Sequence, residues 1–432
     1  MPSSDPSPTM PSSDPSPAER GLVELQLDGL AHGGEAVGRL PGGKACFVAY
    51  AIPGERVLVE VTESRRRWAR ARLVEVLDPS PSRVEPPCPY FGPSRCGGCR
   101  LQHVEAGQQA QMKRRILVEQ LQRIGGIDDP PVAETVRAGE YGYRREARFA
   151  VDDHGRLGFR RTGTGHVIPI DHCLLLTDEA QALRAGAGDE WSGVEEVSVR
   201  TGAGAGDGVL VVRPGSGPVG PLPATAVPVA LVDDLGQAVP LRGETAITET
   251  VAGLEFQVSP TSFFQASRAG AEALLSLVLD AAGAQAGDLA LDLFSGVGLF
   301  ARGLSAAGAD VIAVESHPAA CADARSNLAG CDPVPAVWEC EADAAIARAR
   351  SEQLGVDLIV LDPPRRGAGV ELSAALAELA PRRIVYVSCD PAALARDARA
   401  LGERGYRLAH AVPVDQFAQT AAIEAVATFD PA

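Results

Sequence analysis

The chain has 432 residues, of which 45% are hydrophobic and 22% charged, and its formal net charge is −16. This length suits about two to four domains, each with a core of its own. There is no apolar run of the roughly 18 to 20 residues that a membrane helix needs, no apolar secretion signal in the first twenty residues, and too few cysteines for a disulfide scaffold. We therefore expect a cytoplasmic protein whose thiols are reduced or act as ligands.

The acidity of the chain argues against a nucleic-acid partner only until its distribution is considered. Residues up to Cys173 include 23 basic and 22 acidic side chains, whereas the residues after it include 17 and 34. Every cation except Lys44 and Lys113 is an arginine. The arginines gather in four runs, at residues 65–72, 113–115, 143–148 and 158–161. A solvated face is the ordinary explanation of one such run, but four runs, most of them beside an aromatic residue, favour RNA or single-stranded nucleic acid as a partner.

Residues 1–20 contain the sequence PSSDPSP twice, and we expect a disordered tail there, with Met10 as an alternative start. Residues 21–79 show five short alternating strands separated by glycine and proline turns, which predicts a small antiparallel barrel. The order AHGGEAVGR, an IPGE turn and a basic strand resembles the TRAM domain, an RNA-binding barrel of the OB-like type. The basic run supplies the predicted RNA-binding residues, which are Arg65, Arg66, Arg67, Arg70 and Arg72.

Residues 80–250 are predicted to form an α+β middle domain that contains a helix over residues 102–125. Within it, Cys88, Cys96 and Cys99 form a C-x7-C-x2-C pattern, and Cys173 follows in IPIDHC. Four thiolates suit either a tetrahedral zinc ion or an iron–sulfur cluster, and the spacing does not decide between them. Unrelated buried thiols are the alternative, which the tight CGGC turn disfavours for the first three cysteines.

Residues 251–432 alternate apolar strands with helices, which predicts a Rossmann-like parallel sheet covered on both faces. The sequence LDLFSGVGLFA leads from a strand into a helix, and Gly296 and Gly298 let a ligand approach the backbone. Because GVGLFA also matches a dinucleotide fingerprint, an NAD-dependent oxidoreductase is an alternative. Glu315, at the end of the next strand, suits ribose hydroxyls in either case. Asp292 at the strand end and the later LDPPRRG motif favour S-adenosylmethionine.

Three more side chains stand where chemistry is expected. Asp362 of LDPPRRG follows a strand, where open α/β sheets place their sites, although a helix cap is the plain alternative. DPPR is also compatible with an N-methyltransferase, which needs no nucleophile. Cys389, between an apolar strand and a helix that Pro391 opens, favours a nucleophile over a structural thiol. A thiolate that attacks C6 of uracil makes C5 nucleophilic, and a carboxylate such as Glu424 suffices to remove the C5 proton. Without that context, Glu424 would be taken for a solvent-facing strand residue.

Taken together, several motifs resemble the RNA uracil-C5 methyltransferase family, and the resemblance extends over residues 21–432. The motifs are SCDP-x2-LARD, DLFSGVGLF, DPPRRG, SPTSFFQ, D-x-F-x2-T-x3-E and the FG…CGGC…LQH segment. The resemblance implies that Cys389 is the nucleophile, that Glu424 is the base, and that S-adenosylmethionine donates the methyl group. It also implies a 4Fe–4S cluster on the four cysteines, with zinc as second choice. The implied cofactor or substrate contacts are Gln265, Phe294, Glu315 and Asp362, with Asp343 as a weaker candidate for the adenine.

The chain also departs from the family pattern. Asp390 stands where the family usually has Asn, and Ala422–Ile423 stands where it usually has His-Val. A carboxylate beside the thiolate is expected to raise the thiol's pKa and slow its attack. A catalytically silent RNA-binding protein or RNA chaperone is therefore the second alternative. We predict an enzyme that methylates C5 of one flipped-out uridine in structured rRNA or tRNA, with no membrane or obligate protein partner.

Overall fold

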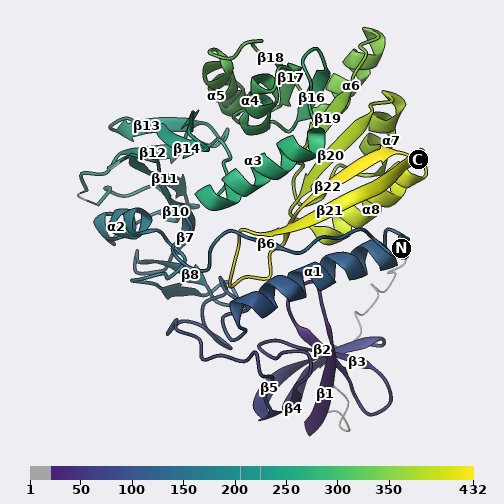
Figure 1. Cartoon of the computed structure of the whole chain (residues 1–432). Coiled ribbons are helices and arrows are strands. Elements are labelled where there is room, and N and C mark those ends of the chain that lie inside the picture. Colours follow the sequence, from purple (N-terminus) through teal and green to yellow (C-terminus); the bar gives the residue numbers. More distant parts are fainter. Residues whose placement is uncertain (1–20, 205, 224) are drawn as a thin grey trace, which may run out of the picture. The chain divides into compact units, whose positions relative to one another are not determined.

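The computed structural model describes residues 21–204, 206–223 and 225–432, and the predicted disordered tail lies outside them. The chain forms two compact units (Figure 1). The first ends at Pro86 and takes in Arg100–Glu105, and the second comprises Pro87–Cys99 and Ala106–Ala432. Within the described ranges, no helix is long and apolar enough to cross a membrane.

The first unit contains five strands: β1 (Leu22–Leu30), β2 (Ala36–Arg39), β3 (Ala45–Val48), β4 (Arg56–Ser64) and β5 (Trp68–Asp78). They close into a barrel in the order β1-β2-β3-β5-β4, which confirms the predicted barrel. It is not antiparallel throughout as predicted, because β3 and β5 pair in parallel. Alternate residues of β4, such as Val57 and Val59, are buried in its interior, as the period of two in a strand requires. Glu55, fully buried, receives two hydrogen bonds from Arg83 at 2.6 and 2.7 Å.

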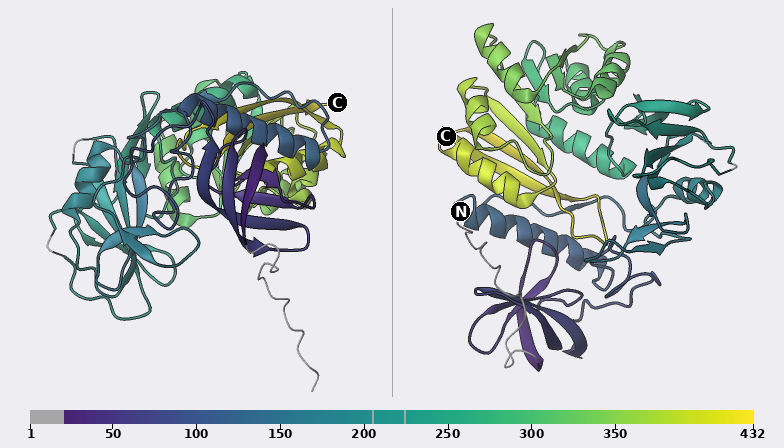
Figure 2. Two further views of the ribbon diagram at one scale, coloured as in Figure 1. Left: turned by 90° about the horizontal axis from the view of Figure 1, so that it is seen from below. Right: turned by 180° about the vertical axis from the view of Figure 1, so that it is seen from behind.

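The second unit begins its regular structure with α1 (Ala106–Arg123) and contains a seven-stranded sheet, seen from two sides in Figure 2. The strands are β7 (Glu146–Val151), β8 (Leu157–Arg160), β9 (Val167–Pro169), β10 (Val194–Thr201), β11 (Gly208–Pro214), β12 (Val229–Val232) and β13 (Ala238–Arg242). Their order is β13-β12-β11-β10-β7-β8-β9, and α2 (Asp178–Gly186) packs on β10 and β11. A separate hairpin, β14 (Ile247–Val251) and β15 (Leu254–Val258), leads to α3 (Arg268–Ala282).

An eight-stranded sheet forms the rest of this unit. Its strands are β6 (Val136–Arg137), β16 (Leu289–Leu293), β17 (Asp310–Glu315), β18 (Ala336–Glu339), β19 (Leu358–Leu361), β20 (Arg383–Ser388), β21 (Tyr406–Asp415) and β22 (Glu424–Pro431). The connecting helices are α4 (Leu299–Ala306), α5 (Pro318–Leu328), α6 (Ala342–Ser351), α7 (Val370–Glu378) and α8 (Pro391–Gly402). The order is β18-β17-β16-β19-β20-β22-β21-β6, and β16 to β20 are parallel.

Side chains that alternate along the strands supply two cores, one on each face of the sheet. Ala290 belongs to the core shared with α3, α4 and α5, whereas its neighbour Leu291 belongs to the core shared with α1, α6, α7 and α8. The apolar runs of β16, β19 and β20 therefore reflect strands that are buried on both faces. Although α1 and β6 lie within residues 80–250 of the sequence, both pack against this sheet, where β6 pairs with β21.

Candidate active site

The candidate site lies where the strand order reverses, between β16 and β19. In open α/β sheets, ligands bind at the carboxyl ends of the strands that flank such a reversal. Asp292 lies near the carboxyl end of β16, and Asp362 follows the last residue of β19 directly. A cavity opens at this edge, lined by Phe263, Phe264, Gln265, Phe294, Ser295, Gly296, Val297, Leu299, Phe300 and Asp362.

The loop from β16 to α4 makes sharp turns around this cavity. Phe294, with φ of 59°, adopts a left-handed conformation that is uncommon for a residue with a side chain, and Gly298, the N-cap of α4, has φ of 92°. A side chain at Gly298 would also meet Leu328 at 3.2 Å. The N–H of Gly296 donates to Glu315 at 3.0 Å, so the predicted ribose-binding carboxylate and the glycine loop are brought together.

Asp292 supports this loop from below the cavity. It is fully buried, and its Oδ2 accepts the N–H of Ala301 at 2.8 Å, while its Oδ1 has no hydrogen-bond partner. Burial raises the pKa of Asp292 to about 8, and the negative charges of Asp362 and Glu315 add to the shift. A buried carboxyl with one oxygen left unpaired is a group that a ligand donor would stabilise.

The register of β20 and β22 brings the predicted nucleophile and base together. These antiparallel strands pair Ser388 with Ala425, so the next residues, Cys389 and Glu424, lie opposite each other at the end of the pairing. Glu424 is buried and Cys389 is half-buried. Local sequence patterns could not predict this pairing. Although β21 follows β20 among the strands along the chain, β22 is the strand that lies between them in the sheet.

Burial and neighbouring charges shift both titrating groups in the same direction. Burial raises the pKa of Cys389 to about 11, and the carboxylates of Glu424 and Asp362 add to this rise. Burial likewise raises the pKa of Glu424 to about 8 and that of Asp362 to about 7. The guanidinium of Arg365 opposes the shifts of Cys389 and Glu424, because a nearby cation stabilises their charged forms.

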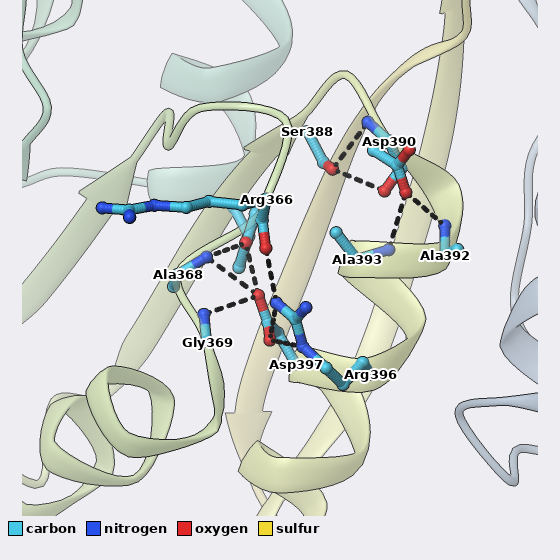
Figure 3. Close-up of polar contacts among 10 residues, drawn as sticks. Arg366, Ala368, Gly369, Ser388, Asp390, Ala392, Ala393, Arg396 and Asp397 are labelled. Carbon is cyan, nitrogen blue, oxygen red and sulfur yellow. Dashed lines mark hydrogen bonds and ion pairs between the residues drawn. The ribbon is translucent and has the colours of Figure 1, made fainter. Parts of the chain in front are cut away.

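Asp390 caps the helix that begins beside the thiol. Its carboxylate caps α8 by accepting the N–H groups of Ala392 and Ala393 at 3.0 and 2.8 Å, as Figure 3 shows. After burial, the charges that most raise the pKa of Cys389 are those of Glu424 and Asp362. Because this carboxylate is bound to backbone N–H groups of the helix, we expect it to raise the pKa of the thiol less than its place in the sequence suggested. The N–H groups of Ala392 and Ala393 at the start of α8 are therefore bound to Asp390 and not directed at the thiol.

Two buried amides connect the carboxyl groups of the site. Gln265 donates from Nε2 to Asp362 at 3.3 Å, and Gln416 donates from Nε2 to Gln265 Oε1 at 3.1 Å and to Glu424 Oε2 at 3.0 Å. Gln265 was predicted from the sequence as a site residue, whereas Gln416 was not. Its position in the DQF motif before Glu424 was the available signal.

Asp343 is placed apart from these groups. It lies exposed in the first turn of α6, beyond β18, and within the described part of the chain no hydrogen bond or ion pair joins it to the residues lining the cavity. Its assignment to the adenine stays a prediction.

The four predicted cysteine ligands gather in the second unit. The charges of Cys173 and Cys88 add to the burial that raises the pKa of Cys96, and Cys99 and Cys173 share a small apolar cluster with Tyr143. However, among residues 21–204, 206–223 and 225–432, no three His, Cys, Asp or Glu side chains are arranged so that they could hold a metal ion. The thiols suit a cluster chemically, but their arrangement does not confirm the predicted metal centre.

In the barrel, the five predicted RNA-binding arginines divide into two kinds. Three are paired with carboxylates: Arg65 with Glu63 at 2.9 Å, Arg70 with Glu35 at 3.4 Å, and Arg72 with Glu60. Arg66 and Arg67, in the turn between β4 and β5, are exposed and have no ion pair within the described ranges. The guanidinium of Arg70 also lies 5.2 Å from the ring of Trp68.

Comparisons with known proteins cover almost the entire chain. A family model for the TRAM domain matches residues 21–74. An uncharacterized RNA methyltransferase of Streptomyces avermitilis is 37% identical, over 95% of this chain and 98% of the relative. The 23S rRNA (uracil(1939)-C(5))-methyltransferase RlmD of Alkalilimnicola ehrlichii is 34% identical, over 94% and 96%. The solved structure of Pyrococcus abyssi tRNA (uracil-54, C5)-methyltransferase, in complex with S-adenosyl-L-homocysteine, shares the fold with a TM-score of 0.71 at 24% identity, over 94% of this chain and 99% of that one.

Proposed function

The chain belongs to the RNA uracil-C5 methyltransferase family, and from this premise we propose that it methylates C5 of one uridine in a structured RNA. A large ribosomal RNA is the first substrate to test, because the relative that is 34% identical is named for 23S rRNA. Transfer RNA is the second, because the fold is shared with an enzyme named for tRNA. Family membership removes the basis of the oxidoreductase alternative, which rested on GVGLFA alone.

The observation that carries the proposal is the pairing of β20 with β22, which sets Cys389 opposite Glu424 beside Asp362. A nucleophile and a base on the same side of one sheet edge suit a reaction that begins with addition and ends with elimination. Gln265 lines the cavity together with Asp362, and Gln416 links Gln265 to Glu424 by hydrogen bonds.

The chain's own residues divide the reaction between them. The thiolate of Cys389 attacks C6 of uracil, which forms an S–C6 bond and makes C5 nucleophilic. When bound, S-adenosylmethionine supplies an electrophilic methyl group. Once C5 carries that methyl group, Glu424 removes the C5 proton. The electrons of the C5–H bond form the C5–C6 double bond, the S–C6 bond breaks, and Cys389 leaves as a thiolate.

The residues around the cavity fit S-adenosylmethionine. Phe263 and Phe294 line the cavity and provide aromatic surface. Behind the glycine loop, Glu315 would provide a carboxylate for hydroxyl groups and the unpaired Oδ1 of Asp292 an acceptor. A cofactor that is cationic at its sulfur also suits an edge with several carboxyl groups, since their negative charges would stabilise it.

We also propose the 4Fe–4S cluster on Cys88, Cys96, Cys99 and Cys173, with zinc as the second possibility, and derive no catalytic step from it. Protein purified without oxygen is expected to show broad visible absorption and to contain iron and sulfide. Zinc in place of iron, with colourless protein, would identify the second metal. Protein free of both metals would overturn this part of the proposal.

The decisive experiment combines an RNA readout with a covalent trap. Nucleoside mass spectrometry of rRNA and tRNA from a deletion strain should show the loss of one 5-methyluridine. With 5-fluorouridine RNA, in which fluorine replaces the proton that Glu424 must remove, the wild-type protein should form a stable adduct and Cys389→Ala none. A wild-type protein that forms no adduct and restores no 5-methyluridine would be the silent RNA-binding protein, and the proposal would fail.

A further inference from the structure

A single amide lies between the base and the rest of the site. Gln416 is buried, with 1% of its surface exposed, and its Nε2 donates to Glu424 Oε2 at 3.0 Å and to Gln265 Oε1 at 3.1 Å. Gln265 in turn donates to Asp362. Both N–H groups of Gln416 are thus engaged, one of them by Glu424. An N–H group directed at a carboxylate favours its ionised form and fixes its orientation.

The residues on either side of Gln416 are tied to one lysine of α1. Lys113 donates from Nζ to Asp415 Oδ1 at 2.6 Å and to the carbonyl oxygen of Phe417 at 3.0 Å. Its side chain is 1% exposed and that of Asp415 is 3% exposed. A buried ion pair of this kind is costly to break, because either charge alone would be left without a partner. The backbone on both sides of Gln416 is therefore held in place.

A second contact from α1 fixes the far end of the same loop. Gln109 donates to Gln419 Oε1 at 2.9 Å and accepts the N–H of Gln419 at 2.9 Å. Gln419 has φ of 68°, a left-handed conformation that needs such support. Gln109 and Lys113 are four residues apart and therefore lie on one face of α1. That face binds the loop near Asp415 and again at Gln419. Tyr143 adds a hydrogen bond to the carbonyl oxygen of Ala418 at 2.9 Å.

We propose that Gln416 is a positioning residue for the Glu424 carboxylate, and that Gln109 and Lys113 of α1 hold Gln416 in that place. The inference rests on the proposed function, since it concerns the proton-removal step of that reaction. Of the two proposed reacting side chains, the amide of Gln416 is hydrogen-bonded to Glu424. Its loss should therefore spare the addition to C6 and the methyl transfer, and should slow the elimination.

A slower proton removal can be detected because the covalent intermediate before that step accumulates. Before elimination, the RNA is joined to Cys389 through the S–C6 bond and already carries the new methyl group on C5. If proton removal becomes the slowest step, this methylated covalent complex builds up. A structural defect would instead lower complex formation and turnover together.

The test uses the full-length protein, S-adenosylmethionine labelled in its methyl group, and unmethylated RNA from a deletion strain. Gln416→Met keeps the length of the side chain and removes its N–H donors. We expect an undiminished rate of methyl transfer to the RNA in the first cycle, a methylated RNA–protein complex that survives denaturing electrophoresis, and steady-state turnover lower by about 10- to 100-fold. Gln109→Met, which leaves no charge unpaired, should show the same pattern more weakly.

Gln285→Met, an exchange of the same kind at an exposed loop position, should behave like the wild type. Thermal unfolding of each variant reports whether it has folded. If Gln416→Met folds but its first-cycle methyl transfer slows in step with steady-state turnover, and no complex accumulates, the positioning role is wrong. If the wild type itself forms no adduct with 5-fluorouridine RNA, the proposed function fails instead, so the two failures are distinguishable.

Discussion

Cys389 and Asp390 are adjacent in the sequence, but their side chains have different surroundings. Cys389 faces the carboxyl groups of the site, whereas Asp390 accepts two backbone N–H groups at the start of α8. An Asn side chain carries an oxygen in the same place and caps helices about as well as Asp. The helix therefore requires a capping oxygen at this position, and we expect the thiol to depend little on whether that oxygen is charged.

Asp390→Asn should consequently change little in either stability or chemistry. We expect the rate of adduct formation with 5-fluorouridine RNA to stay within about twofold of the wild type, since α8 keeps its cap. Asp390→Ala, which removes the cap, should cost about 1 kcal/mol in the free energy of unfolding. Rapid-mixing adduct assays and urea unfolding measure the two effects. A large rise in adduct rate for Asp390→Asn would show that the charge restrains Cys389 after all.

The raised pKa values of Cys389 and Glu424 set the expected pH dependence. In the proposed reaction both groups act in their deprotonated forms, so raising their pKa values depletes the active species at neutral pH. The single-turnover rate should therefore increase from pH 6 through the region of the Glu424 pKa, at about 8, and continue to increase above it while Cys389 deprotonates. Single-turnover methylation measured between pH 6 and 9 checks this. A rate that falls over this range would contradict it.

Arg365 should shift that profile when it is neutralised. Its guanidinium lowers the pKa values of both Cys389 and Glu424, so Arg365→Gln should move the rise in rate towards higher pH. Arg366→Gln is the matched control, because the guanidinium of the neighbouring Arg366 is not among the main charges that shift either group. Identical shifts in the two variants would mean that only the general surface charge matters.

At the scale of elements, α8 anchors the turn that follows Asp362. Asp397 is fully buried and accepts the N–H groups of Ala368 and Gly369 at 2.9 and 3.2 Å (Figure 3). It also accepts the hydroxyl of Tyr386 at 2.8 Å and pairs with Arg396. The turn between β19 and α7 is thereby attached to α8, the helix that begins beside Cys389. The turn after Asp362 and the turn that carries Cys389 are thus both fixed by α8.

Asp397→Ala should therefore be strongly destabilising. It would leave buried donors without an acceptor and Arg396 without its partner, and we expect a loss of about 3 kcal/mol or more in the free energy of unfolding. Glu403→Ala is the control on the same helix, because it breaks only the exposed pair with Arg399. Chemical denaturation of both variants tests this. Equal losses would show that Asp397 is not an anchor.

The sequence predicted best those features that one strand carries by itself. Asp292, Asp362 and Cys389 each stand where an apolar, doubly buried strand ends, and the parallel order of the strands brings such ends to one edge. Features that depend on a distant partner were missed. Lys113 reads as a surface residue of a helix, but it is buried by Asp415, 302 positions later. Cysteine spacing indicates candidate ligands without fixing how their side chains are directed.

For the whole molecule, net charge and RNA binding are separate properties. The excess of acid belongs to the residues after Cys173, and within the barrel many arginines are already neutralised by glutamates. The number of arginines in the barrel therefore overstates the number of cations that are available to bind phosphate groups. The exposed turn between β4 and β5, with Arg66 and Arg67, offers two cations that need not break an ion pair first.

This difference predicts which arginines determine the salt dependence of RNA binding. Replacing both Arg66 and Arg67 by Ala should weaken binding and reduce the slope of log affinity against log salt concentration by about 1.4, at roughly 0.7 per lost contact with a single strand. Arg56→Ala combined with Glu24→Ala removes an exposed ion pair of the barrel at constant net charge, and it should leave the slope unchanged. Filter-binding titrations between 50 and about 300 mM salt distinguish the variants. An unaltered slope for the first pair would place the RNA on another surface.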